Sequence, residues 1–215
     1  GLNVDNDFYL MAAILFGLAE LLIPELARCS TAGSKDRIRY LAMRSLRLAM
    51  LYGSLFGGLL YLLAEDLCVW LYDSSSAGVY LRWFAVLAPM LYCDAVTDAM
   101  IKGLGQQVAC VEYNIITSVM DVVMLFVLLP TYGMEGYFFS FVISHAVNFL
   151  LSIRRLFKLT GRIMNIATPM ITIFVVIISI LGAGMLYNPI LKTVAYILML
   201  GSMLYLFRVI SREDM

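Results

Sequence analysis

Charge is scarce in this 215-residue sequence: Lys and Arg total 15, Asp and Glu total 15, and only 14% of residues are charged. The lack of a basic excess excludes nucleic acid as a partner recognised through net positive charge. An apolar content of 62% excludes both a disordered chain and an ordinary water-soluble enzyme, because too few polar side chains remain to cover the apolar ones.

Motifs of enzymes and metal centres are also lacking. The four cysteines are scattered, without CxxC spacing or a histidine neighbour, so neither a zinc site nor a redox motif is present. No GxSxG, HExxH or P-loop pattern occurs. We therefore expect a protein that is not an enzyme, with no catalytic residue, cofactor or bound metal.

Long apolar runs dominate what remains. A bilayer core about 30 Å thick needs about 20 helical residues to cross it. Windows of that length lie at 8–28, 44–64, 78–101, 107–129, 136–156, 165–186 and 190–210. Continuous apolar runs of this length favour helices over strands. The sequence thus predicts an all-α integral membrane protein with about seven transmembrane helices.

Short breaks separate these windows. Turn residues predict breaks at 103–105, 130–136 and 188–189, the last with a proline at the first position of a helix. Residues 65–76 are too short to span a bilayer and contain Trp70 and Tyr72, which predicts an interfacial turn of helix.

Basic residues alternate between the loops. Thirteen of the fifteen lie in or beside the first, third and fifth inter-span segments and at the C-terminal end, whereas the other loops hold only Arg82 and Lys192. The positive-inside rule then places the N-terminus outside and the C-terminus in the cytoplasm, as seven spans require. We expect a multi-pass protein of the plasma membrane of a bacterial cell.

The basic segment 35–47 has two interpretations. Arg37, Arg44 and Arg47 fit one side of a helical extension and could contact anionic lipid head groups. They could equally do no more than set the orientation of the chain.

Acidic residues lie inside the predicted spans without a base near the span centres. They are Glu20, Asp94, Asp98, Glu112 and Asp121. Carboxylates at such depth face a cavity, find a partner or stay protonated. Helical spacing places Asp94 and Asp98 on one face, and places Asn114, Thr117, Ser118 and Asp121 on one face of the next span.

Two hypotheses fit this arrangement. Asp94 and Asp121 could form a site for a proton or cation that couples transport to an ion gradient. Alternatively, the acids belong to a hydrogen-bonded helix seam, with Asp98 paired to Lys102 one turn on. The only histidine, His145, lies beside polar residues spaced by four (Ser140, Ser144, Asn148 and Ser152), and could be a proton relay or part of an interhelical contact.

Two further features concern packing. Pro89 removes a backbone hydrogen bond within its span and frees a carbonyl near Ala85, which produces either a packing kink or a broken helix along a transport path. Gly53 and Gly57 form a GxxxG pattern, a signal of close helix contact.

Three segments resemble a known family. Ile23-Pro24-Glu25-Leu26-Ala27 resembles the end of a helix in the multidrug/oligosaccharidyl-lipid/polysaccharide (MOP) exporter superfamily. Lys102-Gly103-Leu104-Gly105-Gln106 is similar to its QGLGK turn, with Lys and Gln exchanged, and 128–137 is similar to its LIPxYGIxGY link. The branch resembled most is the stage V sporulation protein B-like group, beside polysaccharide and lipid-II flippases.

The resemblance implies a fold of fourteen helices, of which this chain would be the C-terminal half of a MATE/MOP-type protein. Residues 1–160 would supply the C-terminal-lobe helices and 161–215 two additional ones. The N-terminal lobe would be missing, as the initial Gly1 also suggests, and would be a partner of this chain. The first span would line the central cleft, which makes Glu20 and Pro24 the candidate cleft residues.

The function implied is flipping of a lipid-linked oligosaccharide, polysaccharide or peptidoglycan precursor by alternating access, in contact with membrane lipids. Relatives that move lipid-linked pyrophosphates use cationic cavity residues, and this chain has none at mid-depth. A cation-coupled multidrug exporter and a truncated, non-transporting membrane protein are the alternatives.

Overall fold

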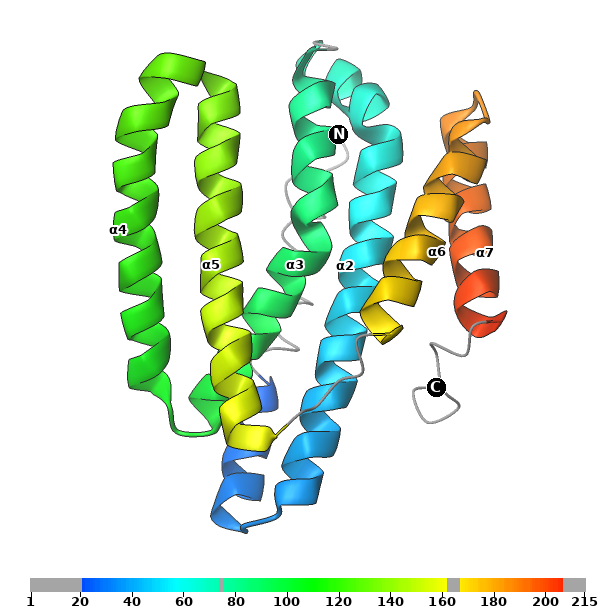
Figure 1. The fold of residues 1–215 in the computed structure, drawn as a ribbon. Helices are drawn as coiled ribbons and strands as arrows, with labels where there is room; N and C mark the ends of the chain where they lie inside the picture. The colour runs from blue at the N-terminus through cyan, green and yellow to red at the C-terminus, as the bar shows by residue number, and fades with distance from the viewer. Residues whose placement is uncertain (1–20, 74–75, 162–166, 207–215) are drawn as a thin grey trace. The chain divides into compact units, whose positions relative to one another are not determined.

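The computed structural model describes residues 21–73, 76–161 and 167–206, and these are helical except for short turns (Figure 1). A helix covers residues 21–31. The others are α2 (Lys35–Tyr72), α3 (Ser76–Gly103), α4 (Gln107–Tyr132), α5 (Met134–Thr160), α6 (Ala167–Gly184) and α7 (Pro189–Leu206). Within this described part, the five helices α2, α3, α4, α5 and α7 are long and apolar enough to cross a membrane, and α6 is apolar but shorter.

The all-α class predicted from the apolar runs is therefore confirmed, and five of the helices have the length and apolar composition that membrane spans require. Six of the predicted spans correspond to α2 to α7, with ends that differ by a few residues except in α2. The first predicted span, 8–28, lies mostly outside the described residues, and its last part belongs to the helix at 21–31.

Two predicted boundaries were wrong. Residues 65–72 do not form a separate interfacial turn, because α2 continues through them as one helix of 38 residues. The predicted break at 130–136 shrinks to Gly133: Pro130 stays inside the last turn of α4, and α5 begins at Met134. Pro130 has no amide to donate to the Phe126 carbonyl, and α4 ends two residues later.

Glycines form the turns at both ends of α4. Gly105 has φ +78° and Gly133 has φ +58°, a backbone region that side chains rarely adopt. Gly103 is required for another reason, since a Cβ there would lie 2.9 Å from the Ile23 carbonyl oxygen and 3.0 Å from Leu26 Cβ. The glycine-rich turn at 103–105 thus combines a close helix contact with a reversal of the chain.

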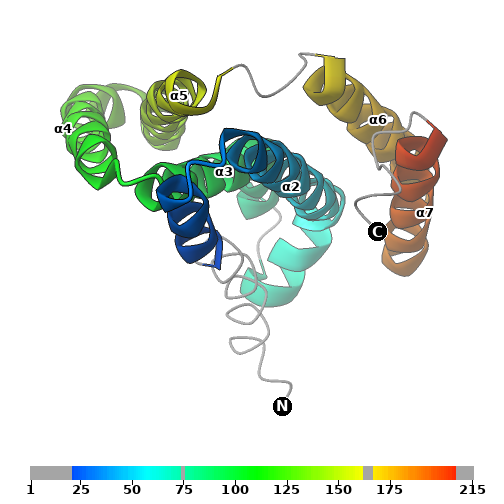
Figure 2. The same cartoon turned by 90° about the horizontal axis from the view of Figure 1, so that it is seen from below.

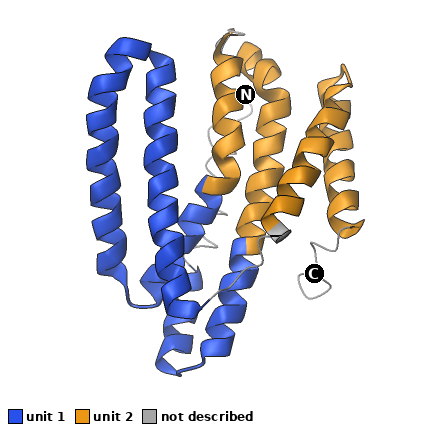
Figure 3. Cartoon of the chain, in the orientation of Figure 1, with its two compact units in different colours: residues 1–46, 91–163 blue, residues 47–90, 164–215 orange. Residues whose placement is uncertain are grey.

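The chain divides into two compact units (Figure 3). Unit 1 comprises residues 1–46 and 91–163, and unit 2 comprises residues 47–90 and 164–215. Helices α2 and α3 each contribute residues to both units.

In unit 1, α4 and α5 form an antiparallel pair that lies side by side in both views (Figures 1 and 2). One face of α5 is buried, and it carries mostly small or polar residues four positions apart: Gly136, Ser140, Ser144, Asn148, Ser152 and Leu156. Small residues let two helix backbones approach closely. Gly136 illustrates this, because a Cβ there would clash with the Leu128 carbonyl of α4.

In unit 2, two glycines of α2 lie in close contact with α3 and α7. A Cβ at Gly57 would lie 2.6 Å from Ala85 O of α3, the carbonyl that Pro89 leaves without its helical donor. A Cβ at Gly58 would clash with the Tyr196 ring of α7. Tyr196 is fully buried, and its hydroxyl donates to Ser54 O at 2.8 Å.

Asn188 and Pro189 begin α7, as predicted. The Asn188 side-chain oxygen accepts a hydrogen bond from Ile190 N at 2.9 Å, and Pro189 occupies the first helical position. The apolar core that α7 shares with α6 and α2 includes Leu62, Val175 and Leu200.

Candidate functional site

The buried face of α5 brings a hydrogen-bonding side chain to each of three embedded acids of unit 1. Asp94 and Asp98 come from α3, and Asp121 comes from α4. The spacing of four along α5 aligns its serines and asparagine in one row, because a helix repeats every 3.6 residues. The hydrogen-bonded seam proposed from the sequence therefore exists.

Asp94 is buried and pairs with Asn148. The Asn148 amide donates to Asp94 Oδ2 at 3.1 Å, and the Asn148 carbonyl oxygen accepts from Thr117 of α4 at 3.5 Å. Asn148 thus links α3 to α4 at the level of Asp94 and Thr117.

Asp98 lies one turn further along α3. Its carboxylate accepts a hydrogen bond from Ser152 at 2.8 Å. The predicted ion pair of Asp98 with Lys102 is not among those of the described residues, and the donor that Asp98 has is Ser152 of α5. Near the same helix ends, Arg155 donates to Gln106, which ties α5 to the turn before α4.

Asp121 lies near the middle of α4, about 21 Å along the helix from its first residue and about 17 Å from its last. Its Oδ1 accepts hydrogen bonds from Ser140 at 2.5 Å and Ser144 at 3.1 Å. Both serines are buried, whereas Asp121 is half-buried. The carboxylate therefore has two fixed donors on one oxygen and a second oxygen with space around it.

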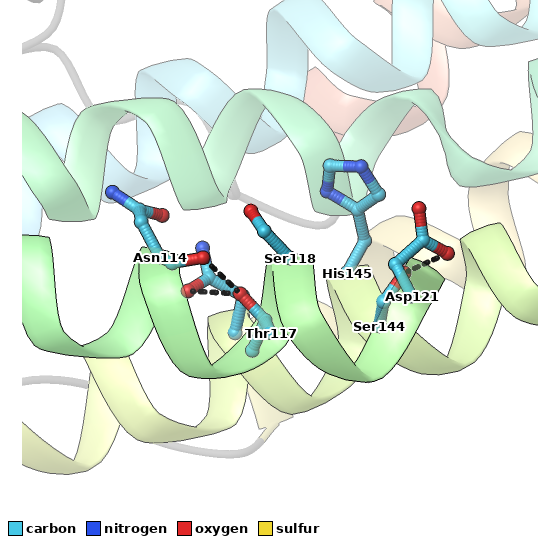
Figure 4. A pocket seen from close by; sticks show the side chains of 7 residues that line it. Asn114, Thr117, Ser118, Asp121, Ser144 and His145 are labelled. Carbon is cyan, nitrogen blue, oxygen red and sulfur yellow. Dashed lines mark hydrogen bonds between the residues drawn. The ribbon is translucent and has the colours of Figure 1, made fainter. Parts of the chain in front are cut away.

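A pocket of about 110 Å³ opens beside Asp121. Each residue that lines it has a polar or ionisable side chain, and they are Asn114, Thr117, Ser118, Asp121, Ser144, His145 and Asn148. Asn114, Ser118, His145 and Asp121 extend toward the same side of the α4–α5 pair (Figure 4). The lining holds one carboxylate and one imidazole but no lysine or arginine.

One ring nitrogen of His145 forms no hydrogen bond within the described residues. The ring packs on Phe141 with centroids 4.2 Å apart, and Nδ1 is buried with no hydrogen-bond partner in the described structure. A buried polar atom without a partner is uncommon and costs free energy. A water or small ion in the pocket could supply the missing contact, since the volume admits several water molecules.

The structure joins some of the predicted site residues and separates others. Asp121 and His145 share the pocket, and Asp94 reaches it through Asn148. Pro24 is exposed in the helix at 21–31, and Glu112 is exposed on α4. Glu20 lies outside the described residues.

The predicted lipid-contact arginines lie in the helical extension expected for them. Arg37 is exposed and forms an ion pair with Glu25 at 2.8 Å, and the Arg44 guanidinium lies 3.4 Å from the Tyr40 hydroxyl. Arg44 and Arg47 are half-buried. Contact of these three residues with lipid head groups stays a prediction.

Asn148 is the residue that sequence reasoning undervalued. It was noted only as part of a polar row, yet it bridges two helices and lines the pocket. The signal was its position midway along that row, level with Thr117 on the neighbouring helix.

Comparison of the chain with known family models, with curated proteins and with solved structures finds no match. The helices define an all-α protein with the length and composition of membrane spans.

Proposed function

We propose that this chain is part of a membrane transporter that works by alternating access, and that it forms the C-terminal half of a MOP-type flippase for a lipid-linked glycan. The support for a transporter is an apolar helical chain with carboxylates in the interior of its spans. The glycan substrate and the MOP family rest on the resemblance of residues 23–27, 102–106 and 128–137.

The observation that carries the proposal is the pocket beside Asp121. A polar cavity at the middle of two spanning helices is expensive to maintain in a bilayer, and such cavities mark ion and substrate paths. One carboxylate oxygen is held by Ser140 and Ser144, so the other is free to take a proton or a cation. We assign this pocket the coupling role.

A cation-coupled drug exporter is the second candidate, and the pocket lining favours it. The lining has a carboxylate and no lysine or arginine, which suits a positively charged ligand better than a pyrophosphate. In a flippase of lipid-linked pyrophosphate, the basic residues would have to come from elsewhere.

The test is transport by the whole protein in proteoliposomes under an imposed proton or sodium gradient. Two probes are used: a fluorescent undecaprenyl-pyrophosphate disaccharide, followed by bleaching from the outer leaflet, and the cationic dye ethidium. Movement of the lipid supports the flippase, and movement of the dye alone supports the exporter. Movement of neither would refute the transporter.

The variants Asp121→Asn and Glu112→Gln form a matched pair on α4. Both remove one acidic charge, but only Asp121 lines the pocket, while Glu112 is exposed. We expect Asp121→Asn to abolish gradient-driven transport and Glu112→Gln to leave the rate within about twofold. Equal rates in the two variants would exclude the coupling role of Asp121.

A further inference from the structure

The two bases that stand apart in the sequence come together in unit 2. Arg82 of α3 and Lys192 of α7 are the only basic residues in the sparse alternate loops, and both line one pocket of about 410 Å³. The lining residues come from the last part of α2 and of α6 and from the first part of α3 and of α7, so the pocket lies at one end of unit 2.

The lining combines positive charge with apolar surface. Besides the two bases it includes Tyr61, Leu62, Leu181 and Met185, and it contains no acidic residue. Leu181 is 64% exposed and Met185 is 86% exposed, so apolar surface continues outward from the pocket. A ligand that fits has a negative head and an apolar tail.

The acids that pair with these bases lie nearer the solvent than the bases do. Arg82 Nη1 is 3.3 Å from Glu65 Oε1, with side chains 35% and 55% exposed; Lys192 Nζ is 3.7 Å from Asp66 Oδ2, with side chains 20% and 45% exposed. The second distance exceeds a hydrogen bond. Each base therefore has N–H donors that its neighbouring acid does not engage.

Arg82 gives direct evidence of an unused donor. Its guanidinium lies over the Tyr61 ring, 5.8 Å from the centroid, while Nε is buried with no hydrogen-bond partner among the described residues. A cation–π contact and an ion pair hold the group in place. A fixed guanidinium with a free, buried N–H is suited to donate a hydrogen bond to a phosphate oxygen.

We propose that this pocket binds the phosphate of an anionic phospholipid between Arg82 and Lys192, with an acyl chain along Leu181 and Met185. The level of the pocket agrees with this occupant, because the ends of membrane-spanning helices lie near lipid head groups. The apolar share of the lining favours a lipid over free phosphate. The binding is independent of the transport function proposed above.

The test is native mass spectrometry of the purified protein in detergent, titrated with dioleoyl phosphatidylglycerol and with dioleoyl phosphatidylcholine. The double variant Arg82→Gln/Lys192→Gln should bind the anionic lipid at least tenfold more weakly, since the loss of each base near a membrane surface weakens anionic-lipid binding several-fold. Unchanged affinity in this variant would overturn the proposal.

Two further variants make the result specific. Glu65→Gln/Asp66→Asn removes the competing acids and should raise the affinity severalfold, an outcome that still decides the question if the first variant does not fold. Arg154→Gln/Lys158→Gln removes the same charge from the end of α5. It should change the affinity of the tightest phosphatidylglycerol site by less than twofold. A loss there as large as at Arg82 and Lys192 would indicate general charge attraction and refute the site.

Inorganic phosphate separates the two sources of the anion. Millimolar sodium phosphate should not displace bound phosphatidylglycerol, because phosphate gains nothing from Leu181 and Met185. Displacement would identify free phosphate as the ligand and overturn the lipid assignment.

Discussion

Asn148 of α5 donates its side-chain amide to the Asp94 carboxylate of α3, 3.1 Å away and 54 residues earlier in the chain. Both side chains are buried, and Asn148 also contacts Thr117 of α4. This contact joins three helices of unit 1 at the level of the polar pocket. It explains how an acid can be accommodated in an apolar span, since a buried charge needs hydrogen-bond partners.

We predict that Asn148→Leu destabilises the protein, because it leaves Asp94 buried without its donor. The expected loss is about 1–3 kcal/mol. Thermal unfolding in detergent, followed by circular dichroism, measures it. In the double variant Asp94→Leu/Asn148→Leu the loss should be smaller than the sum of the single losses, and additive losses would contradict a direct interaction.

Gly57→Ala should destabilise unit 2. The added Cβ would lie 2.6 Å from Ala85 O, which belongs to the backbone and cannot move away cheaply. We expect a loss of about 1–3 kcal/mol. Gly201→Ala is the control, because no atom lies within 4 Å of a Cβ there, and the substitution should be neutral or slightly stabilising. Similar melting temperatures for both variants would disprove the close contact of α2 and α3.

Tyr196→Phe tests the hydroxyl contact of α7 with α2. The ring would keep its place against Gly58, but the hydrogen bond to Ser54 O at 2.8 Å would be lost. We expect a destabilisation of about 1 kcal/mol. Tyr187→Phe, at a fully exposed side chain, should have no effect on the same unfolding curve. No difference between the two variants would show that the Tyr196 hydroxyl contributes nothing.

The orientation predicted from the basic loops has its own test. All four native cysteines are buried, so a single exposed cysteine can be labelled with a membrane-impermeant maleimide. Tyr187→Cys should react in intact cells, and Ala32→Cys should react only in inside-out vesicles. The reverse pattern would invert the topology.

Much of the fold is local and therefore predictable from sequence. Apolar runs of sufficient length specify helices, because each helix satisfies its own backbone hydrogen bonds. The start of α7 at Asn188 and Pro189 is equally local. Proline was misjudged at Pro130, where a residue that often ends helices lies inside the last turn of α4.

The candidate site was predictable only in part. Helical periodicity placed Asp94 and Asp98 on one face of α3, and it placed Ser144 and Asn148 in one row on α5. Periodicity could not tell which acid meets which donor, because the rotation and register of packed helices depend on contacts between segments distant in sequence. Lys102 was therefore assigned to Asp98, where the structure has Ser152.

The helices, their apolar character and the separation of the charges could be predicted from sequence, since all three follow from the composition of individual segments. Only the tertiary structure decided that Asp121 and His145 share a pocket, and that Arg82 and Lys192 line another. The physical reason is that such contacts depend on which helix faces are buried together, which no single segment encodes.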